Sequence, residues 1–117
     1  MFQDVVLTLS QMGLKEKDAT VYLVCLHFKE GLYVHEIARQ TKLKRSGVDV
    51  ILQRLIHGGY VSKVKVGNRY KYFAQNPESI LFKQEEALEN FKTIMPMLSN
   101  LSGQKRETEI RFFEGQK

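Results

Sequence analysis

The chain has 117 residues, of which 43% are apolar, enough for one domain with a core of its own and at most one appended element. No apolar run approaches the roughly 20 residues of a membrane-spanning helix, and the first residues lack the basic segment of a signal peptide. Cys25 is the single cysteine, which excludes an internal disulfide and favours a reducing, cytoplasmic location.

Two amphipathic helices are expected in the first thirty residues. The first covers about residues 2–12 and is stopped by Gly13; its inward residues are expected to be Val5, Val6, Leu9 and Met12. The second covers about 16–28. Its apolar residues recur at i, i+3, i+4 and i+7, the period of one buried helical face, and are Ala19, Tyr22, Leu23 and Leu26.

The next segment has the layout of a helix-turn-helix. Leu32 and Tyr33 suggest a short strand, a helix is predicted over 34–41 with Ile37 and Ala38 inward, and a second helix is predicted over about 44–58. The inward residues of this second helix are Val48, Ile51, Leu52 and Leu55. Its remaining face comprises Arg45, Ser46, Asp49, Val50, Gln53, Arg54 and His57. That face is available for contact with a partner.

A β-hairpin, the wing, is predicted over residues 60–75. Two alternating runs flank Gly67-Asn68, and a two-residue link of this kind favours a type II′ turn. The aromatic residues of this segment are Tyr60, Tyr70, Tyr72 and Phe73. We interpret them as packing the sheet against the helices rather than as a stacking platform for single-stranded nucleic acid.

Positive charge is concentrated on the second helix of the helix-turn-helix and on the wing. Residues 39–71 contain nine basic residues and one acid, Asp49, which gives this segment a charge of +8. Because the whole chain carries +5, the remainder sums to −3. A helix-presenting fold with charge focused on it is typical of a DNA-binding protein.

A long helix is predicted over residues 77–102. Asn76, Pro77 and Glu78 supply an N-cap, a first-position proline and a first-turn acid. Apolar residues follow at alternating steps of three and four, with Gln84 as the only polar interruption and Leu88 as a flanking leucine. They are Ile80, Ala87, Leu88, Phe91, Ile94, Leu98 and Leu101. A coiled coil with a second copy would cover this stripe. The alternative is that the helix folds back on its own domain or on an effector domain.

The fold class expected is therefore mainly α with a small β-hairpin. A winged helix-turn-helix occupies 1–76, a dimerisation helix 77–102 and a loose tail 103–117. Residues 109–113 look like a strand without a partner in this chain, and an unpaired apolar strand favours aggregation.

The order and spacing of these segments resemble the TrmB-type transcriptional regulators of archaea and bacteria. The similar stretches are MGLKEKDATVYLVCL, VHEIARQTKLKRSGVDVILQRLIHGGYV, RYKYFAQNPES and EIRFFEG. The resemblance implies a winged helix that binds operator DNA as a dimer, in a prokaryotic cytoplasm. In many members of the family an effector-binding domain follows, and the resemblance implies that such a domain would pair with the strand expected over 109–113. The chain departs from the family pattern at Lys44, Gly47, Asp49 and Val50, on or near the DNA-facing side, so the resemblance implies the mode of binding and not the operator sequence.

The predicted contacts with double-stranded DNA come from the second helix, in the major groove, and from the wing, on the backbone or in the minor groove. They are Lys42, Lys44, Arg45, Ser46, Asp49, Gln53, Arg54, Lys63, Lys65, Asn68, Arg69 and Lys71. Arg45 is placed for guanine and Arg54 for phosphate. The plainer alternatives are a solvated helix face and edge-strand lysines that prevent aggregation.

The sequence predicts neither catalysis nor a cofactor. Its three histidines lack the spacing of metal ligands, no nucleophile–base pair or phosphate loop is present, and Cys25 lies in an apolar helical stripe. We expect no membrane contact and no small-molecule ligand. The main hypothesis is a homodimeric, sequence-specific DNA-binding regulator. The alternative is a winged-helix protein-interaction module within a larger transcription or nucleic-acid complex.

Overall fold

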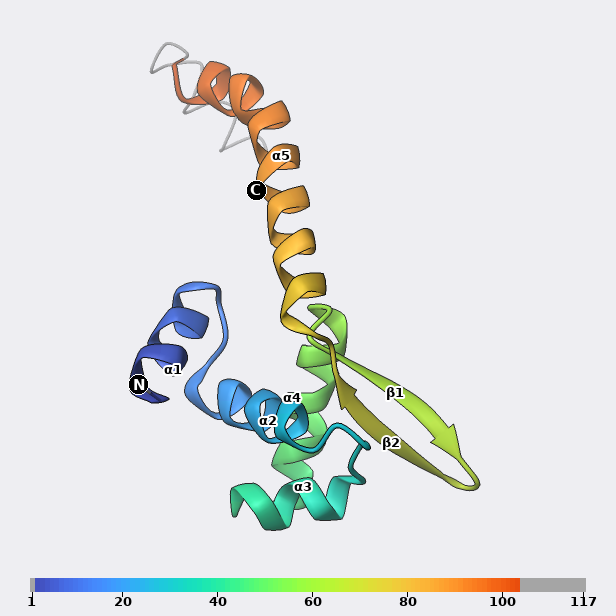
Figure 1. Cartoon of the computed structure of the whole chain (residues 1–117). Helices are drawn as coiled ribbons and strands as arrows, with labels where there is room; N and C mark the ends of the chain where they lie inside the picture. The colour runs from blue at the N-terminus through green and yellow to red at the C-terminus, as the bar shows by residue number, and fades with distance from the viewer. Residues whose placement is uncertain (1, 104–117) are drawn as a thin grey trace, which may run out of the picture. The chain divides into compact units, whose positions relative to one another are not determined.

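Five helices and one β-hairpin form the part of the chain that the computed structural model describes, residues 2–103 (Figure 1). In order they are α1 (Phe2–Gln11), α2 (Glu16–His27), α3 (Val34–Thr41), α4 (Arg45–His57), β1 (Val61–Val66), β2 (Arg69–Ala74) and α5 (Pro77–Ser102). The helix bounds lie within one residue of those predicted from the sequence. The expectation of a mainly α fold with a small hairpin and a long final helix is confirmed.

The chain divides into two compact units, Met1–Ile80 and Leu81–Lys117. The first unit contains α1 to α4, the hairpin and the first turn of α5, and it carries the hydrophobic core. The second unit contains the rest of α5. No helix within residues 2–103 combines the length and the hydropathy that a membrane span requires.

The core of the first unit is built from α2, α3, α4 and the base of the hairpin. All four inward residues predicted for α4 are buried: Val48, Ile51, Leu52 and Leu55. Ile37 of α3 is buried as expected, and Ala38 is partly buried. Because these side chains repeat with the helical period, their burial fixes which face of α4 is left for solvent.

The first helix is less covered than its sequence suggests. Val6, Leu9 and Met12 are half-buried, but Val5, also predicted to point inward, is 38% exposed and Leu7 is 60% exposed. The prediction for Val5 is therefore wrong for this chain alone. The physical reason is that α1 packs against α2 on one side, so a stripe as wide as the predicted one is not fully covered.

The hairpin is antiparallel, with a register that runs from Val61 opposite Ala74 to Val66 opposite Arg69. Gly67 has a φ of 64°, whereas Asn68 does not have a positive φ, which fits the predicted type II′ turn and excludes type I′. The strand expected at Leu32 and Tyr33 is reduced to a single bridge, in which Leu32 pairs with Tyr72 of β2.

The start of α5 is capped as the sequence predicts. The side-chain Oδ1 of Asn76 accepts a hydrogen bond of 2.7 Å from the backbone N–H of Ser79, and Pro77 occupies the first helical position. Ile80, in this first turn, is buried in the winged-helix core. The strand predicted over 109–113 lies outside the described residues.

Candidate nucleic-acid interface

The outer face of α4 is polar and open to solvent, as predicted. Its residues Arg45, Ser46, Asp49, Gln53 and Arg54 are all exposed, on the side opposite the four buried aliphatic residues. Val50, on the same outer face, is 55% exposed. A single exposed valine is common on protein surfaces. On this face, however, Val50 offers an apolar surface that could contact an apolar group such as the methyl group of thymine.

The beginning of α4 carries an unusual charge for a helix N-terminus. In the described chain, every other helix has an acid in its first turn, namely Asp4, Glu16 with Asp18, Glu36 and Glu78. The first turn of α4 has no acid; Lys44 is its N-cap, without a side-chain capping bond, and Arg45 follows. Two cations at the positive end of a helix dipole destabilise the helix but favour the binding of an anion.

The turn between α3 and α4 places two further lysines. Thr41 closes α3 by donating a hydrogen bond of 2.8 Å from its Oγ1 to the carbonyl of Ile37. Lys42 then adopts the left-handed conformation, with φ 62° and ψ 27°, and its N–H bonds the carbonyl of Ala38 at 2.8 Å. Leu43 is half-buried, which leaves Lys42 and Lys44 exposed on either side of it.

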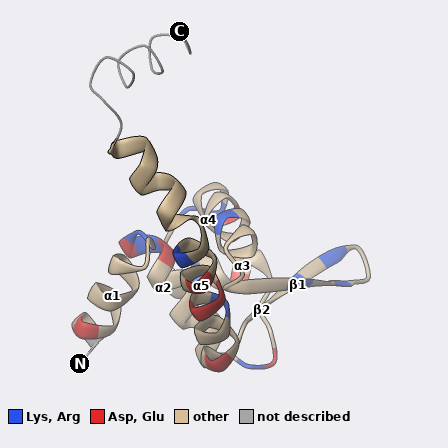
Figure 2. Cartoon of the chain, turned by 90° about the horizontal axis from the view of Figure 1, so that it is seen from above, with Lys and Arg blue, Asp and Glu red and all other residues tan. Residues whose placement is uncertain are grey.

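The wing carries several basic residues, coloured blue in Figure 2. The register of its strands places them on two different faces of the hairpin. Because side chains alternate along a strand, Lys63 and Lys65 share one face with Tyr70 and Tyr72, whereas Arg69 lies on the other face with Lys71. The ammonium of Lys63 lies 4.5 Å from the centre of the Tyr70 ring. The predicted shared face of residues 63 and 65 is confirmed, and the wing presents positive charge on both sides.

A polar groove of about 380 Å³ joins the wing to the starts of α3 and α4. It brings together three of the predicted DNA contacts: Arg45 of α4 and Asn68 and Arg69 of the wing. The other lining residues are Tyr33, Val34, His35, Tyr70 and Tyr72. Tyr33 and His35 were not identified from the sequence as part of a site, because no local pattern shows that the start of α3 lies beside the wing.

Asp49 is close enough to the hairpin to influence Tyr72 electrostatically. Burial raises the pKa of the Tyr72 hydroxyl, and the negative charge of Asp49 and the ionisable Tyr70 hydroxyl raise it further. Tyr60 and Tyr72 are buried, as the packing interpretation of the aromatic residues requires, and Phe73 is half-buried. Tyr70 departs from that interpretation: it is 40% exposed, because it lies near the tip of the wing, beyond the core.

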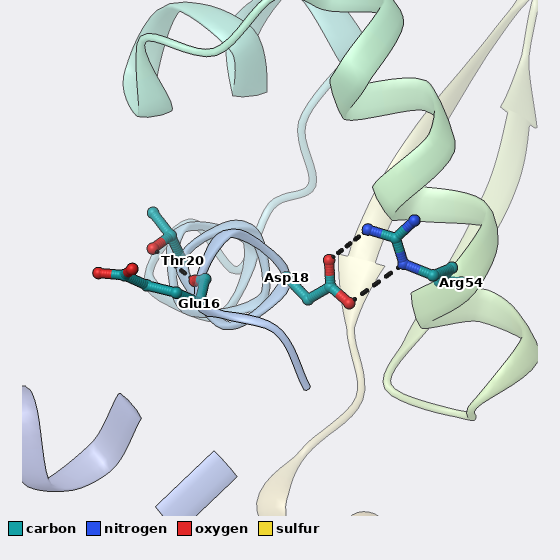
Figure 3. Close-up of polar contacts among 4 residues, drawn as sticks. All are labelled: Glu16, Asp18, Thr20 and Arg54. Atoms are coloured by element: carbon teal, nitrogen blue, oxygen red, sulfur yellow. Dashed lines mark hydrogen bonds and ion pairs between the residues drawn. The ribbon is translucent and has the colours of Figure 1, made fainter. Parts of the chain in front are cut away.

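Arg54 has a partner that the sequence did not predict (Figure 3). Its Nη2 donates to Oδ1 of Asp18 at 2.7 Å, and its Nε donates to Oδ2 at 3.2 Å. The Asp18 side chain is 6% exposed and that of Arg54 is 43% exposed. The hydrogen bond to Asp18 raises the pKa of the Arg54 guanidinium. Arg54 thus ties α4 to α2, and its predicted contact with phosphate stays a prediction.

Removal of the Arg54 charge should therefore affect folding more than the electrostatics of DNA binding. In Arg54→Met the buried Asp18 carboxylate loses both hydrogen bonds, so the melting temperature should fall. The salt dependence of DNA binding should stay that of the wild type if the ion pair with Asp18 keeps Arg54 from phosphate. Thermal unfolding and binding titrations at several salt concentrations test this; a shallower salt dependence with an unchanged melting temperature would instead support the phosphate contact.

The expected dimer residues of α5 divide into two groups. Ile80, predicted for the dimer stripe, is instead 9% exposed and packs in the winged-helix core, because the first turn of α5 belongs to that unit. The rest of the stripe is exposed within the Leu81–Lys117 unit: Ala87, Leu88, Phe91, Ile94, Leu98 and Leu101. Within the described chain these apolar side chains face solvent.

The described residues offer little for redox or metal chemistry. Cys25 is 1% exposed, and burial raises the pKa of its thiol to about 12, so the reactive thiolate is scarce near neutral pH. In residues 2–103 no three histidine, cysteine or acidic side chains gather as a metal site would require. Cys25 is a small buried apolar residue, as its place in the helical stripe predicted.

Comparison with solved structures supports the fold. An archaeal protein from Sulfolobus tokodaii, ST1889, is 26% identical, with a TM-score of 0.55, over 74% of this chain and 84% of its own. YusO from Bacillus subtilis is 21% identical, with a TM-score of 0.53, over 97% of this chain and 80% of its own. MepR from Staphylococcus aureus is a transcription regulator whose structure has been solved in complex with DNA. It is 17% identical, with a TM-score of 0.51, over 97% of this chain and 83% of its own.

The comparison with protein families is more specific. No curated protein sequence matched the chain. The family model described as "Sugar-specific transcriptional regulator TrmB" matches residues 9–78, which span the end of α1, the helix-turn-helix, the whole wing and the first residues of α5. The family is thus described as one of transcriptional regulators, as MepR is among the structural neighbours. With more than half of its residues matched, and with a winged-helix fold, the chain belongs to the TrmB family of transcriptional regulators.

Proposed function

We propose that this chain binds double-stranded DNA sequence-specifically as a homodimer. In this proposal α4 enters the major groove, with Arg45 and Ser46 at base edges and Asp49 and Gln53 further along the same face. Lys42 and Lys44 contact the backbone beside α4. The wing contacts the backbone or the minor groove through Lys63, Lys65, Asn68, Arg69 and Lys71.

One observation carries the proposal: Arg45, at a helix start without acids, lines the same groove as Asn68 and Arg69 of the wing. A major groove admits one α-helix, and the N-terminal side chains of that helix reach the bases. A basic hairpin beside such a helix meets the flanking phosphates. A merely solvated surface gives no reason for cations from α4 and the wing to line one groove.

The proposed dimer rests on the apolar stripe of α5. Leu88, Phe91, Ile94, Leu98 and Leu101 are each between 42% and 53% exposed. From Phe91 onward these residues follow at alternating steps of three and four, the spacing of a coiled-coil seam, and Leu88 flanks that seam. A second copy of the same helix is the partner that a symmetric assembly provides. Two α4 helices related by a two-fold axis bind half-sites about 34 Å apart, or a multiple of it, so we expect a pseudo-palindromic operator.

Binding measured at two salt concentrations tests the proposal against the alternative of a protein-interaction module. A gel shift with genomic DNA fragments should give selective complexes at low salt that weaken as salt rises. Lys65→Ala and Arg69→Ala should weaken binding to all duplexes alike, and each should reduce the slope of log K against log [salt] by about one.

The control for these wing variants is Lys17→Ala, which removes an exposed charge from α2, outside the basic segment. It should leave both the affinity and the slope close to those of the wild type. A wild-type protein without salt-sensitive duplex binding would rule out the proposal and favour the interaction module.

A further inference from the structure

The loop before α3 is bound to the outer edge of the wing. The backbone N–H of Leu32 donates to the carbonyl of Tyr72 at 3.1 Å, and the N–H of Tyr72 donates to the carbonyl of Leu32 at 2.8 Å. Gly31, with a φ of 89°, lies so close to the sheet that a Cβ there would be 2.5 Å from the Phe73 ring. Residues 31–33 are therefore held beside β2 by a single antiparallel bridge, at Leu32.

The register of this bridge sets the direction of the Tyr33 side chain. Since Leu32 faces Tyr72 in an antiparallel pairing, Tyr33 stands opposite Lys71 and shares its face of the sheet, on which Arg69 also lies. The guanidinium carbon of Arg69 is 3.9 Å from the centre of the Tyr33 ring, and the ammonium of Lys71 is 5.4 Å from it. Both distances are within the range of a cation–π contact.

The Tyr33 ring is not required for capping α3. That function uses its backbone, whose N–H donates to Oε1 of Glu36 at 2.8 Å. The ring instead lies nearly parallel to that of His35, at 6.0 Å and 9°, and beneath the guanidinium of Arg69. The backbone of Tyr33 thus caps α3, whereas its ring contacts Arg69. The ring can therefore be replaced without removing the cap.

We propose that Tyr33 is a positioning residue for DNA binding, which holds Arg69 in the groove that it shares with Arg45, ready for a backbone phosphate of the duplex. This inference rests on the proposed function and adds a residue outside the basic segment to it. An arginine at a hairpin tip samples many rotamers, and ordering it on binding costs entropy. Stacking on Tyr33 orders the guanidinium before DNA arrives, while its N–H groups remain at the edge of the stack.

A double-mutant cycle between Tyr33 and Arg69 tests this inference. Tyr33→Leu should weaken operator binding about two- to fivefold, the value of an exposed cation–π contact, whereas Tyr33→Phe should bind nearly as the wild type does. Because Tyr33→Leu removes no charge, its slope of log K against log [salt] should be unchanged, unlike that of Arg69→Ala. In an Arg69→Ala background, Tyr33→Leu should cause little additional loss.

Two results would overturn the inference: wild-type affinity in Tyr33→Leu, or losses from Tyr33→Leu and Arg69→Ala that simply add. A measurement on the unmodified protein does not depend on how any variant folds. The side-chain protons of Arg69 should show an upfield NMR shift from the Tyr33 ring current, and ordinary shifts would also overturn it. Failure of the proposed function is distinguishable, because Arg45→Ala and Arg69→Ala would then leave DNA binding unaffected.

Discussion

Replacing Phe91 with aspartate is expected to convert a dimer into monomers and to weaken operator binding, while the winged helix stays folded. Phe91 lies at the middle of the exposed α5 stripe and is 49% exposed. In a coiled coil this position is covered by the partner helix, where a carboxylate would lose its hydration. Sedimentation at micromolar concentration measures the oligomeric state, and circular dichroism with thermal unfolding checks the fold.

Phe82 supplies the matched control for this variant. It is an equally large aromatic residue on the same helix, 66% exposed, and nine residues from Phe91, which at 3.6 residues per turn places it on the opposite face. Phe82→Asp should therefore remain dimeric. A wild-type protein that sediments as a monomer, or equal dissociation of the two variants, would contradict a dimer formed through this stripe.

Replacing Arg45 with alanine should cost about 1–3 kcal/mol on the operator and relax specificity at one base pair. The reason is that Arg45 stands at the start of α4, where a side chain reaches base edges, and is exposed in the groove shared with the wing. Binding to the operator and to random duplex is measured in parallel, together with a panel of operators that carry single base-pair changes.

The contrast with a wing variant makes the Arg45 result interpretable. Lys65→Ala should reduce binding to operator and random DNA by the same factor, because a phosphate contact does not depend on the base sequence. Arg45→Ala should reduce operator binding more than random binding. An equal loss on both kinds of DNA would remove Arg45 from base recognition and leave it as one more phosphate contact.

The sequence predicted well the features that depend on local periodicity. The buried face of α4 repeats at the helical period and excludes polar residues, so both its bounds and its inward side chains could be predicted. The turn at Gly67 could be predicted for a similar reason, since a two-residue link between alternating strands restricts the backbone to few conformations.

The pairings between distant residues could not be predicted in this way. Asp18 and Arg54 are 36 positions apart, and their ion pair depends on how α2 packs against α4. Tyr33 and Arg69 meet only because Leu32 pairs with β2 in one particular register. Ile80 has the same heptad position as Ile94, two heptads on, but is buried, because it lies in the turn of α5 that joins the core.

The left-handed conformation of Lys42 implies a compromise between folding and binding. A residue with a Cβ in this conformation destabilises the fold by about 1 kcal/mol or more. Glycine at the same position would avoid this cost, because it has no Cβ. A glycine, however, would bring no charge to the turn beside α4. Substitutions that relax this turn should therefore raise the stability of the winged helix at the expense of its attraction for DNA, the trade-off expected where backbone strain is kept at a functional site.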